Sequence, residues 1–252
     1  MTESSAEKSL DNVSAVEWDK LAAKRIFFGH QSVGYNIMDG VRTLMKEHPS
    51  IRLTIVDTKD PSRIESPVFA HAQVGRNEDP GSKCEAFEQY LDSGIGSRVD
   101  IAFLKFCYVD VNRDTDVGEM FESYKAMVQR IKTNYPGLIL VHVTVPLTSS
   151  DHNLKARFKA LVNKALGRKD ANVARSELNE RIRNEYGGSA PVFDFAAIES
   201  TSPAGEPVTF TYRGRKYPCM FPGYTTDGGH LNEAGKRTAA AGLLHLLVRI
   251  AR

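Results

Sequence analysis

Apolar residues along the chain fall into short, nearly continuous runs that are separated by longer segments of helical periodicity. The strongest run spans Val99 to Cys107, and its uniform apolarity is typical of a strand buried on both faces of a parallel sheet. Shorter runs predict further strands at residues 25–28, 51–56, 138–145 and 190–195. These runs indicate a sheet that is largely buried.

Helices are predicted between these strands. Apolar residues spaced three and four apart begin at Val33, and a second helical pattern runs from Val117 to Tyr135. Further helices are predicted at 83–91, within 151–186, and at the C-terminus, where Asn232 caps a helix that ends near Ile250. The alternation predicts an α/β fold, a three-layer sandwich with a central parallel sheet flanked by helices, of the flavodoxin-like kind.

Three segments lack a regular pattern. Residues 57–82 and 199–226 are rich in proline and glycine and are expected to be loops. Residues 1–19 are polar and are expected to form a loose leader, anchored by Trp18, the only tryptophan. Because no linker or repeat is visible, residues 20–252 are expected to form a single domain.

Composition and charge narrow the classes of function. The 252 residues are 41% hydrophobic and 25% charged, as in one globular domain, and a net charge of +2 is too small to indicate a nucleic-acid partner. No apolar run is long enough to span a bilayer, so we expect a soluble protein without membrane insertion. The polar N-terminus lacks a signal core, but a signal peptide could have been removed. Cytoplasmic and secreted locations both stay open, as does the oligomeric state.

Motifs for metals, nucleotides and disulfides are missing from the sequence. The cysteines are odd in number, widely spaced and form no CxxC pair, and His30 and His71 lack the spacing of a metal motif. No GxGxxG or P-loop sequence follows a predicted strand. We therefore expect neither a metal nor a cofactor.

Ser32 stands at the start of the first predicted helix, directly after the first strand. Open parallel sheets bind ligands beyond the carboxyl ends of their strands. A serine at a helix N-terminus has a free backbone N–H and a dipole that favours developing negative charge, and both suit a nucleophile. Taken alone, the position also suits an ordinary helix cap.

Asp227 and His230 form a second feature, just before the last predicted helix. A serine hydroxyl needs a base to take its proton, and histidine serves best when a carboxylate orients its ring. The two residues are bridged by a pair of glycines, so one tight turn can point both side chains the same way. Each feature sits where a parallel sheet places its active site, and together they predict a catalytic triad of Ser32, Asp227 and His230.

The stretch Asp227-Gly228-Gly229-His230-Leu231-Asn232-Glu233-Ala234-Gly235 resembles the DxxH-(P/L)-N-x-x-G motif of the SGNH (GDSL-like) hydrolases. In that superfamily the serine also follows the first strand, and the order of elements over residues 24–250 is similar. The resemblance implies a serine hydrolase that forms an acyl-enzyme. It also implies an oxyanion hole built from the serine N–H, a glycine N–H and an asparagine side chain. Ser32 and Gly75 match the first two donors by position.

Two differences from the family pattern indicate a divergent member. The usual Gly-Asp-Ser is here His30-Gln31-Ser32. The usual Gly-x-Asn-Asp falls on residues 107–110, where Val109 stands in place of the asparagine. Asn77, two residues after Gly75, is expected to supply the missing donor, although a role in the turn suits it equally.

Residues near the serine are predicted to contact the substrate, namely His30, Gln31, Lys105 and Tyr108. The stretch 199–224 is aromatic and polar, which suits a sugar or a small polar ester. We therefore expect the partner to be a small-molecule or carbohydrate ester, with an acetyl group on a carbohydrate as the leading candidate.

Alternatives to this function and fold stay open. The same triad could transfer its acyl group to another acceptor, and a member that lacks the asparagine could bind a ligand without catalysis. The rival fold is the α/β-hydrolase, whose acid and histidine are usually well separated in sequence, unlike Asp227 and His230.

Overall fold

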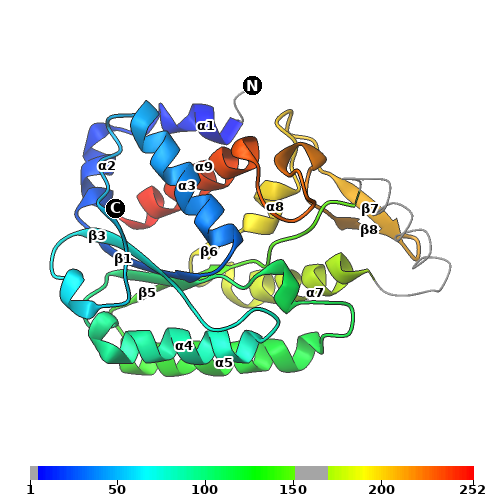
Figure 1. The fold of residues 1–252 in the computed structure, drawn as a ribbon, viewed down its shortest axis with the longest axis horizontal. Coiled ribbons are helices and arrows are strands. Elements are labelled where there is room, and N and C mark those ends of the chain that lie inside the picture. The colour runs from blue at the N-terminus through cyan, green and yellow to red at the C-terminus, as the bar shows by residue number, and fades with distance from the viewer. Residues whose placement is uncertain (1–4, 151–169) are drawn as a thin grey trace.

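A computed structural model describes residues 5–150 and 170–252 of the chain (Figure 1). Six strands form one parallel sheet, in the order β2-β3-β1-β4-β5-β6. Their bounds are β1 Arg25–His30, β2 Ile55–Asp57, β3 Val68–Gln73, β4 Ile101–Leu104, β5 Ile139–Val143 and β6 Val192–Phe193.

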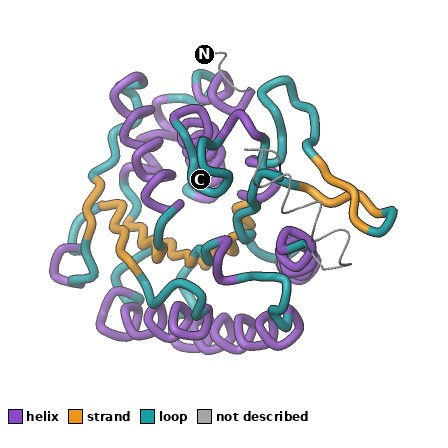
Figure 2. Tube along the Cα trace, turned by 45° about the vertical axis from the view of Figure 1, so that its right-hand side comes forward, coloured by secondary structure: helices purple, strands orange, loops and turns teal. Residues whose placement is uncertain are grey.

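Helices cover both faces of this sheet, which Figure 2 shows as an orange layer between purple helices. One face carries α1 Ser5–Leu10, α2 Ala15–Ala22, α3 Val33–Glu47, α8 Phe195–Glu199 and α9 Glu233–Ile250. The other face carries α4 Pro80–Tyr90, α5 Val117–Asn134 and α7 Ala171–Tyr186. The predicted α/β sandwich of three layers is confirmed.

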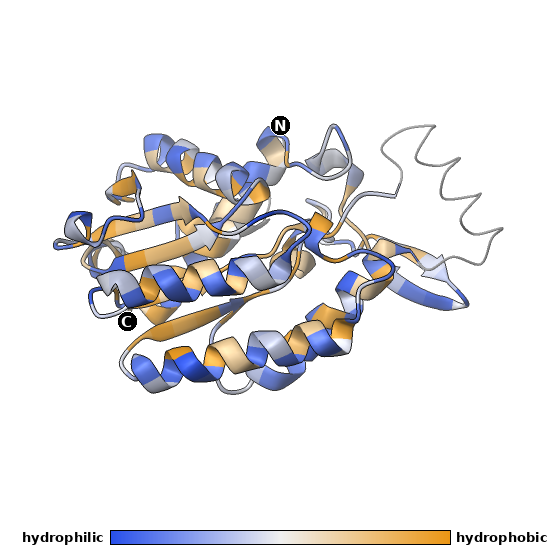
Figure 3. Cartoon of the chain, turned by 60° about the horizontal axis from the view of Figure 1, so that its bottom comes forward, coloured by the Kyte–Doolittle hydropathy of each residue, from blue (hydrophilic) through white to orange (hydrophobic). Residues whose placement is uncertain are grey.

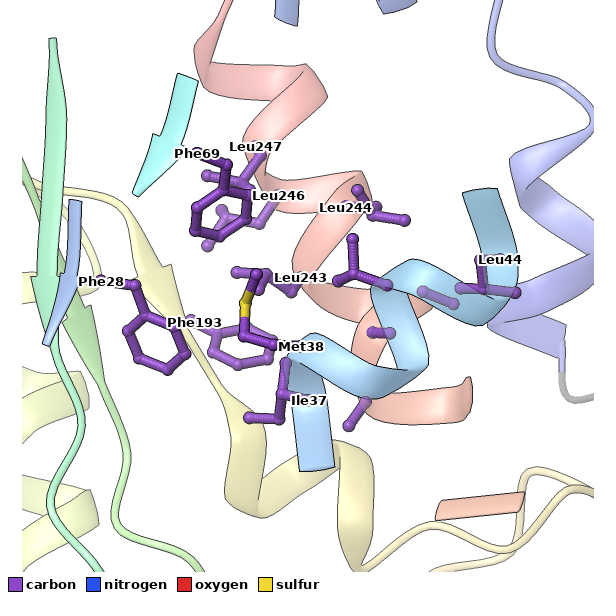
Figure 4. Packing of buried hydrophobic residues seen from close by; sticks show 14 of the residues in the cluster. Phe28, Ile37, Met38, Leu44, Phe69, Phe193, Leu243, Leu244, Leu246 and Leu247 are labelled. Atoms are coloured by element: carbon purple, nitrogen blue, oxygen red, sulfur yellow. The ribbon is translucent and has the colours of Figure 1, made fainter. Parts of the chain in front are cut away.

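The core is divided by the sheet into two halves. Successive side chains of β1 point to opposite faces, so Phe28 packs beneath α3 and α9 whereas Phe27 packs against α4 and α5. Figure 4 shows Phe28 beside Met38 of α3 and Leu243 of α9, and Figure 3 shows the apolar strands running between helices of mixed hydropathy. This packing fixes α3, and with it the residue that precedes its first turn.

Parallel pairing brings the carboxyl ends of the central strands to one edge. His30 is paired with Gln73 of β3, and Gly29 is paired with Leu104 of β4. The loops that follow β1, β3 and β4 therefore leave the sheet side by side, and the loop after β1 begins between the other two.

One central strand was not expected from the sequence. β3 lies inside residues 57–82, which were predicted to be a loop, and it pairs with both β2 and β1. Pro67 directly precedes this strand and His71 interrupts its apolar run, so the pattern is weak. The expected strand at 51–56 is reduced to the short β2.

Two irregular segments also contain structure. Residues 199–226 include an antiparallel hairpin of β7 Thr209–Tyr212 and β8 Arg215–Pro218. The described part of the expected leader forms α1 and most of α2, with Leu10 and Trp18 buried in the core, so it is not loose. The predicted boundary at residue 20 falls inside α2.

The remaining predicted helices match α3, α4, α5 and α9 to within a few residues. In 151–186, α7 accounts for the described part, and residues 151–169 lie outside the described residues. No helix in the described ranges is both long enough and apolar enough to cross a membrane. Short helical turns connect several elements, at Pro61–Arg63, Leu91–Ile95, Tyr108–Asp110 and Pro222–Tyr224.

Candidate active site

Ser32 occupies the N-cap position of α3 without acting as a cap. Its side chain makes no hydrogen bond to the first turn of the helix. Its backbone has φ 48° and ψ −107°, a conformation that is rare for a residue with a side chain. Strained residues of this kind concentrate at functional sites, and here the strain turns the hydroxyl away from the helix.

The loop before α9 is folded around the carboxylate of Asp227. Oδ1 accepts hydrogen bonds from the backbone N–H groups of Gly229 at 2.9 Å and of His230 at 2.8 Å. Gly228 adopts φ 91°, which is open to glycine at little cost. The N–H of Leu231 reaches the Asn36 side chain of α3 at 3.2 Å, so the loop is attached to the helix that Ser32 begins.

These two segments bring the three predicted triad residues together. Oδ2 of Asp227 lies 2.6 Å from Nδ1 of His230, and Nε2 of the same ring lies 2.8 Å from the Ser32 hydroxyl oxygen. An ionised carboxylate can only accept, so the proton of the neutral ring belongs on Nδ1. Nε2 is then left as the acceptor for the serine proton, which is the arrangement that a general base requires.

The ionisation of Asp227 supports this tautomer. Burial alone would raise the pKa of the carboxyl group, but hydrogen bonds from Gly229 and His230 outweigh it and hold the pKa well below its usual range. The side chains of Asp227 and His230 are 53% and 47% exposed, so a substrate can approach the pair from solvent. A charged acceptor beside an accessible imidazole suits proton transfer at neutral pH.

The backbone N–H groups of Ser32 and Gly75 are the two oxyanion donors that were expected from the sequence. No described residue accepts a hydrogen bond from the N–H of Ser32 or from that of Gly75. Gly75 has φ 53°, and a side chain there would collide with the backbone of Lys83, with its Cβ 2.5 Å from the Lys83 nitrogen. The turn after β3 therefore requires glycine at this position.

Comparison with known proteins gives matches among solved structures alone. No family model and no curated protein matches the chain. A protein described as a platelet activating factor from Streptococcus pneumonia has a TM-score of 0.52 at 18% identity, covering 95% of this chain and 97% of that one. A Desulfitobacterium hafniense protein assigned to the G-D-S-L family of lipolytic proteins has a TM-score of 0.50 at 8% identity, covering 88% and 99%. The periplasmic domain of a lipopolysaccharide acetyltransferase from Salmonella ser. Paratyphi A has a TM-score of 0.50 at 11% identity, covering 92% and 85%.

These likenesses show that the chain shares its fold with proteins of this group, among them the G-D-S-L family protein. At these identities its sequence is a divergent one, and the likeness is one of fold. In this fold Ser32 follows β1, and Asp227 and His230 precede the last helix, in the order expected from the sequence.

Gln31 replaces the aspartate of the Gly-Asp-Ser pattern and has a structural task. Its side-chain amide donates to the carbonyl oxygens of Val74, at 2.8 Å, and of Gly75. Its own backbone carbonyl lies 3.6 Å from the thiol of Cys107. The residue before Ser32 thus joins the loop after β1 to the loops after β3 and β4.

The structure corrects part of the predicted substrate-binding set. His30 and Lys105 are completely enclosed and Gln31 is buried, so none of the three has a side chain that reaches a substrate at the surface. His30 contacts His71 through Nε2 and Nδ1 at 3.0 Å, and burial lowers the pKa of His30 to about 2. Lys105 donates to the carbonyl oxygen of Phe106 at 3.0 Å, and burial lowers its pKa. His30 therefore contacts the neighbouring strand β3, and Lys105 contacts the loop after β4.

Tyr108 is the one predicted contact residue that lies beside the triad. Its ring meets the ring of His230 edge-on, with 5.9 Å between centroids. A Cβ on Gly229 would come within 2.6 Å of the Tyr108 ring, so that glycine leaves room for it. Arg175 also contacts Tyr108. Its Nε donates to the Tyr108 carbonyl oxygen at 3.0 Å, and its guanidinium lies 5.7 Å from the centre of the Tyr108 ring. Burial lowers the pKa of Arg175 to about 10.

A buried ion pair beside Gly75 was missed by the sequence analysis. Lys83 of α4 lies 2.5 Å from Asp110, and Lys83 also donates to Asn77 at 3.0 Å. Lys83 carries no signal in the sequence, because a lysine in an amphipathic helix is usually exposed. Asp110 does match the final aspartate of the Gly-x-Asn-Asp pattern, and this was the only available clue.

No group of three or more histidine, cysteine, aspartate or glutamate side chains in the described residues is arranged to hold a metal ion. His30 and His71 are in contact, but His71 is engaged on its other nitrogen by Arg42 at 3.0 Å. The proton on His71 therefore belongs on Nδ1, facing His30, because an arginine can only donate. The two rings form a buried hydrogen-bonded chain.

Proposed function

We propose that the protein is a serine esterase that hydrolyses a small acyl ester through Ser32, His230 and Asp227. One observation carries the proposal. The Ser32 hydroxyl stands at a helix N-cap but is hydrogen bonded to the His230 imidazole and not to the N–H groups of its own helix. An ordinary capping serine directs its oxygen to the N–H of the second or third helical residue. A serine that gives up this bond for a histidine held by a carboxylate has the geometry of a nucleophile.

The reaction follows from the protonation states of these groups. Ser32 Oγ forms a bond to the ester carbonyl carbon, its proton moves to His230 Nε2, and the carbonyl π electrons move to the oxygen. The resulting imidazolium is stabilised by ionised Asp227. The oxyanion collapses, and the alcohol leaves with the proton from His230. Water then attacks the acyl-enzyme with His230 as base, releasing the acid and restoring Ser32.

The substrate class is proposed from the exposure of the triad and from the composition of residues 199–224. Asp227 and His230 are open to solvent, which suits a polar alcohol more than a long acyl chain. Aromatic and polar residues in 199–224 include Tyr212 and Tyr217, whose rings contact one another on the β7–β8 hairpin. We therefore favour a short acyl group, with acetyl on a carbohydrate first.

A series of p-nitrophenyl esters of increasing chain length tests the proposal. We expect kcat/KM to be highest for acetate or propionate and to be abolished in Ser32→Ala. A fluorophosphonate should label wild type and leave Ser32→Ala unlabelled. Absence of both turnover and labelling in folded wild type would instead favour a protein that binds a ligand without catalysis.

Acyl transfer is the second candidate, and the structural likeness to a lipopolysaccharide acetyltransferase domain favours it. Hydrolysis and transfer share the acyl-enzyme and differ only in whether water or another hydroxyl attacks it. Turnover of p-nitrophenyl acetate in the presence of sugar acceptors separates them. Acetylated sugar formed at the expense of free acetate, at millimolar acceptor, would identify a transferase.

A further inference from the structure

Lys83 and Asp110 form an ion pair that is sealed from water next to the active-site loops. Both side chains are 0% exposed, and Nζ of Lys83 lies 2.5 Å from Oδ2 of Asp110. Buried charges are costly unless each is paired and hydrogen bonded. Asp110 meets this condition with the backbone N–H of Cys107 at 2.6 Å and that of Glu78 at 2.9 Å. Lys83 meets it with a second acceptor, Oδ1 of Asn77, at 3.0 Å.

This contact determines which way the Asn77 amide faces. A lysine ammonium has three donors and no acceptor, so Asn77 must present its oxygen to Lys83. The NH2 group then points away from Lys83. No described residue accepts a hydrogen bond from it, and Asn77 itself is exposed although its anchor is buried. The amide thus offers oriented donors on the open side of the loop.

The loop that carries Asn77 is held by hydrogen bonds at its beginning and at its end. Gln31, the neighbour of Ser32, binds the carbonyl oxygens of Val74 and Gly75 at its beginning. Glu78 binds Asp110 at its end. Asp110 closes the turn Tyr108–Asp110, whose first residue packs against the ring of His230. The loop with Asn77 is therefore attached to Gln31, which precedes Ser32, and to the turn Tyr108–Asp110, which contacts His230.

We propose that the Lys83–Asp110 pair is a positioning device, which holds Asn77 as the third donor to the oxyanion. The inference rests on the serine esterase function proposed above. In the family pattern this donor is an asparagine of the loop after β4, where Val109 stands here. In this proposal the donor lies in the loop after β3, and Asp110 of the loop after β4 is part of its anchor. Because Lys83 is neutralised by Asp110, the oxyanion receives a hydrogen bond from Asn77 without a competing charge.

Asn77→Asp tests the orientation of the amide directly. One carboxylate oxygen can still accept from Lys83, so the loop and the fold are preserved. The other oxygen replaces the NH2 group and faces the oxyanion with a negative charge. We expect kcat to fall by about 10²- to 10³-fold with KM nearly unchanged, as for loss of one oxyanion donor. The rate of fluorophosphonate labelling of Ser32 should fall in parallel. Asn112→Asp, an exposed residue after the neighbouring strand, is the matched control.

Lys83→Met tests the anchor. We expect kcat to fall by about tenfold or more in the wild-type background, and to change by less than about twofold when Asn77 is already alanine. If Lys83→Met leaves Asp110 unpaired and the protein unfolds, Lys83→Met with Asp110→Asn removes both charges and serves instead.

Two results would overturn the inference. One is wild-type kcat in Asn77→Asp, which would make Asn77 a turn residue only. The other is an equal fold-decrease of kcat when Lys83→Met is introduced into the wild type and into Asn77→Ala. Failure of the proposed function is distinguished by Ser32→Ala: if that variant keeps wild-type turnover, the esterase proposal itself is wrong.

Discussion

The hydroxyl oxygen of Ser32 and Nε2 of His230 lie 2.8 Å apart although 198 residues separate them in the chain. Packing of α3 against α9 creates this approach, because the two residues lie just before the first turns of these two helices. Gly40 permits it, since a side chain at that position of α3 would overlap the carbonyl of Lys236 in α9. The distance between the Ser32 hydroxyl and the His230 ring is thus set by a contact between two helices.

Ser32→Ala should remove activity and leave stability nearly intact. Loss of the nucleophile is expected to lower kcat by about 10⁴-fold or more. The stability of α3 should be unchanged, because the Ser32 side chain makes no capping hydrogen bond. Thermal unfolding and ester hydrolysis would be measured together.

Asp116→Ala gives the opposite pattern and serves as control. The Asp116 side chain caps α5 by accepting from Glu119 N–H at 3.0 Å, so its loss should cost about 1 kcal/mol of stability with activity retained. Turnover that persists in folded Ser32→Ala would contradict the assignment of the nucleophile.

The pH dependence of turnover should report one group on its acidic side. A base must be unprotonated to accept the serine proton, so activity should be lost at a pH acidic enough to protonate it. Asp227 should add no second step above about pH 4, because its pKa lies well below its usual range. His230→Ala should abolish both the rate and this limb. Asp227→Asn should be the milder change, since it leaves the imidazole in place but no longer selects its tautomer. An unaltered acidic limb in His230→Ala would point to a different base.

Gly229→Ala should disturb the triad through Tyr108. The added methyl group would lie 2.6 Å from the Tyr108 ring, and this ring contacts both His230 and Arg175. Displacement of the imidazole should lower kcat by about 10- to 100-fold. Adding Tyr108→Ala should restore part of the loss by making room. Gly188→Ala, where a Cβ meets nothing within 4 Å, is the control. No recovery in the double variant would place the cause elsewhere.

Buried histidines should make the protein unstable in acid. Burial lowers the pKa of His30 to about 2 and that of His142 to about 3, so both stay neutral in the folded state. In the unfolded state a histidine takes up a proton below about pH 6.5. The unfolded state then binds more protons, so the free energy of unfolding falls by about 1.4 kcal/mol per pH unit for each histidine as the pH decreases.

His142→Phe isolates one of these contributions. Phenylalanine keeps the stack on Tyr186, whose centroid lies 3.5 Å from that of His142, although it loses the hydrogen bond to Tyr124. The pH dependence of the free energy of unfolding between about pH 6 and pH 4, measured by chemical denaturation, should become shallower by about 1.4 kcal/mol per unit. A slope equal to that of wild type would mean that His142 is charged when folded.

Local patterns in the sequence determined a large part of this protein. Apolar periodicity predicted α3 and α5, because a helix that buries one face repeats its apolar residues every three or four positions. A capping asparagine at position 232 predicted the start of α9. The pairing of Asp227 with His230 was equally local, since one turn with two glycines joins them. Ser32 was found because a parallel sheet always presents the residue after its strand at the same edge.

Contacts between distant segments were decided only by the tertiary structure. Insertion of β3 beside β1 brings Gly75 to Gln31, and no property of residues 57–82 alone announces that pairing. The same sheet order buries His30 and Lys105, which the sequence had placed at the substrate. Lys83 and Asp110 are 27 positions apart and meet because the fold brings α4 against the loop after β4. A charged residue is stable at such depth only when its partner arrives from another element, so its role depends on the folded chain and not on its own neighbours in sequence.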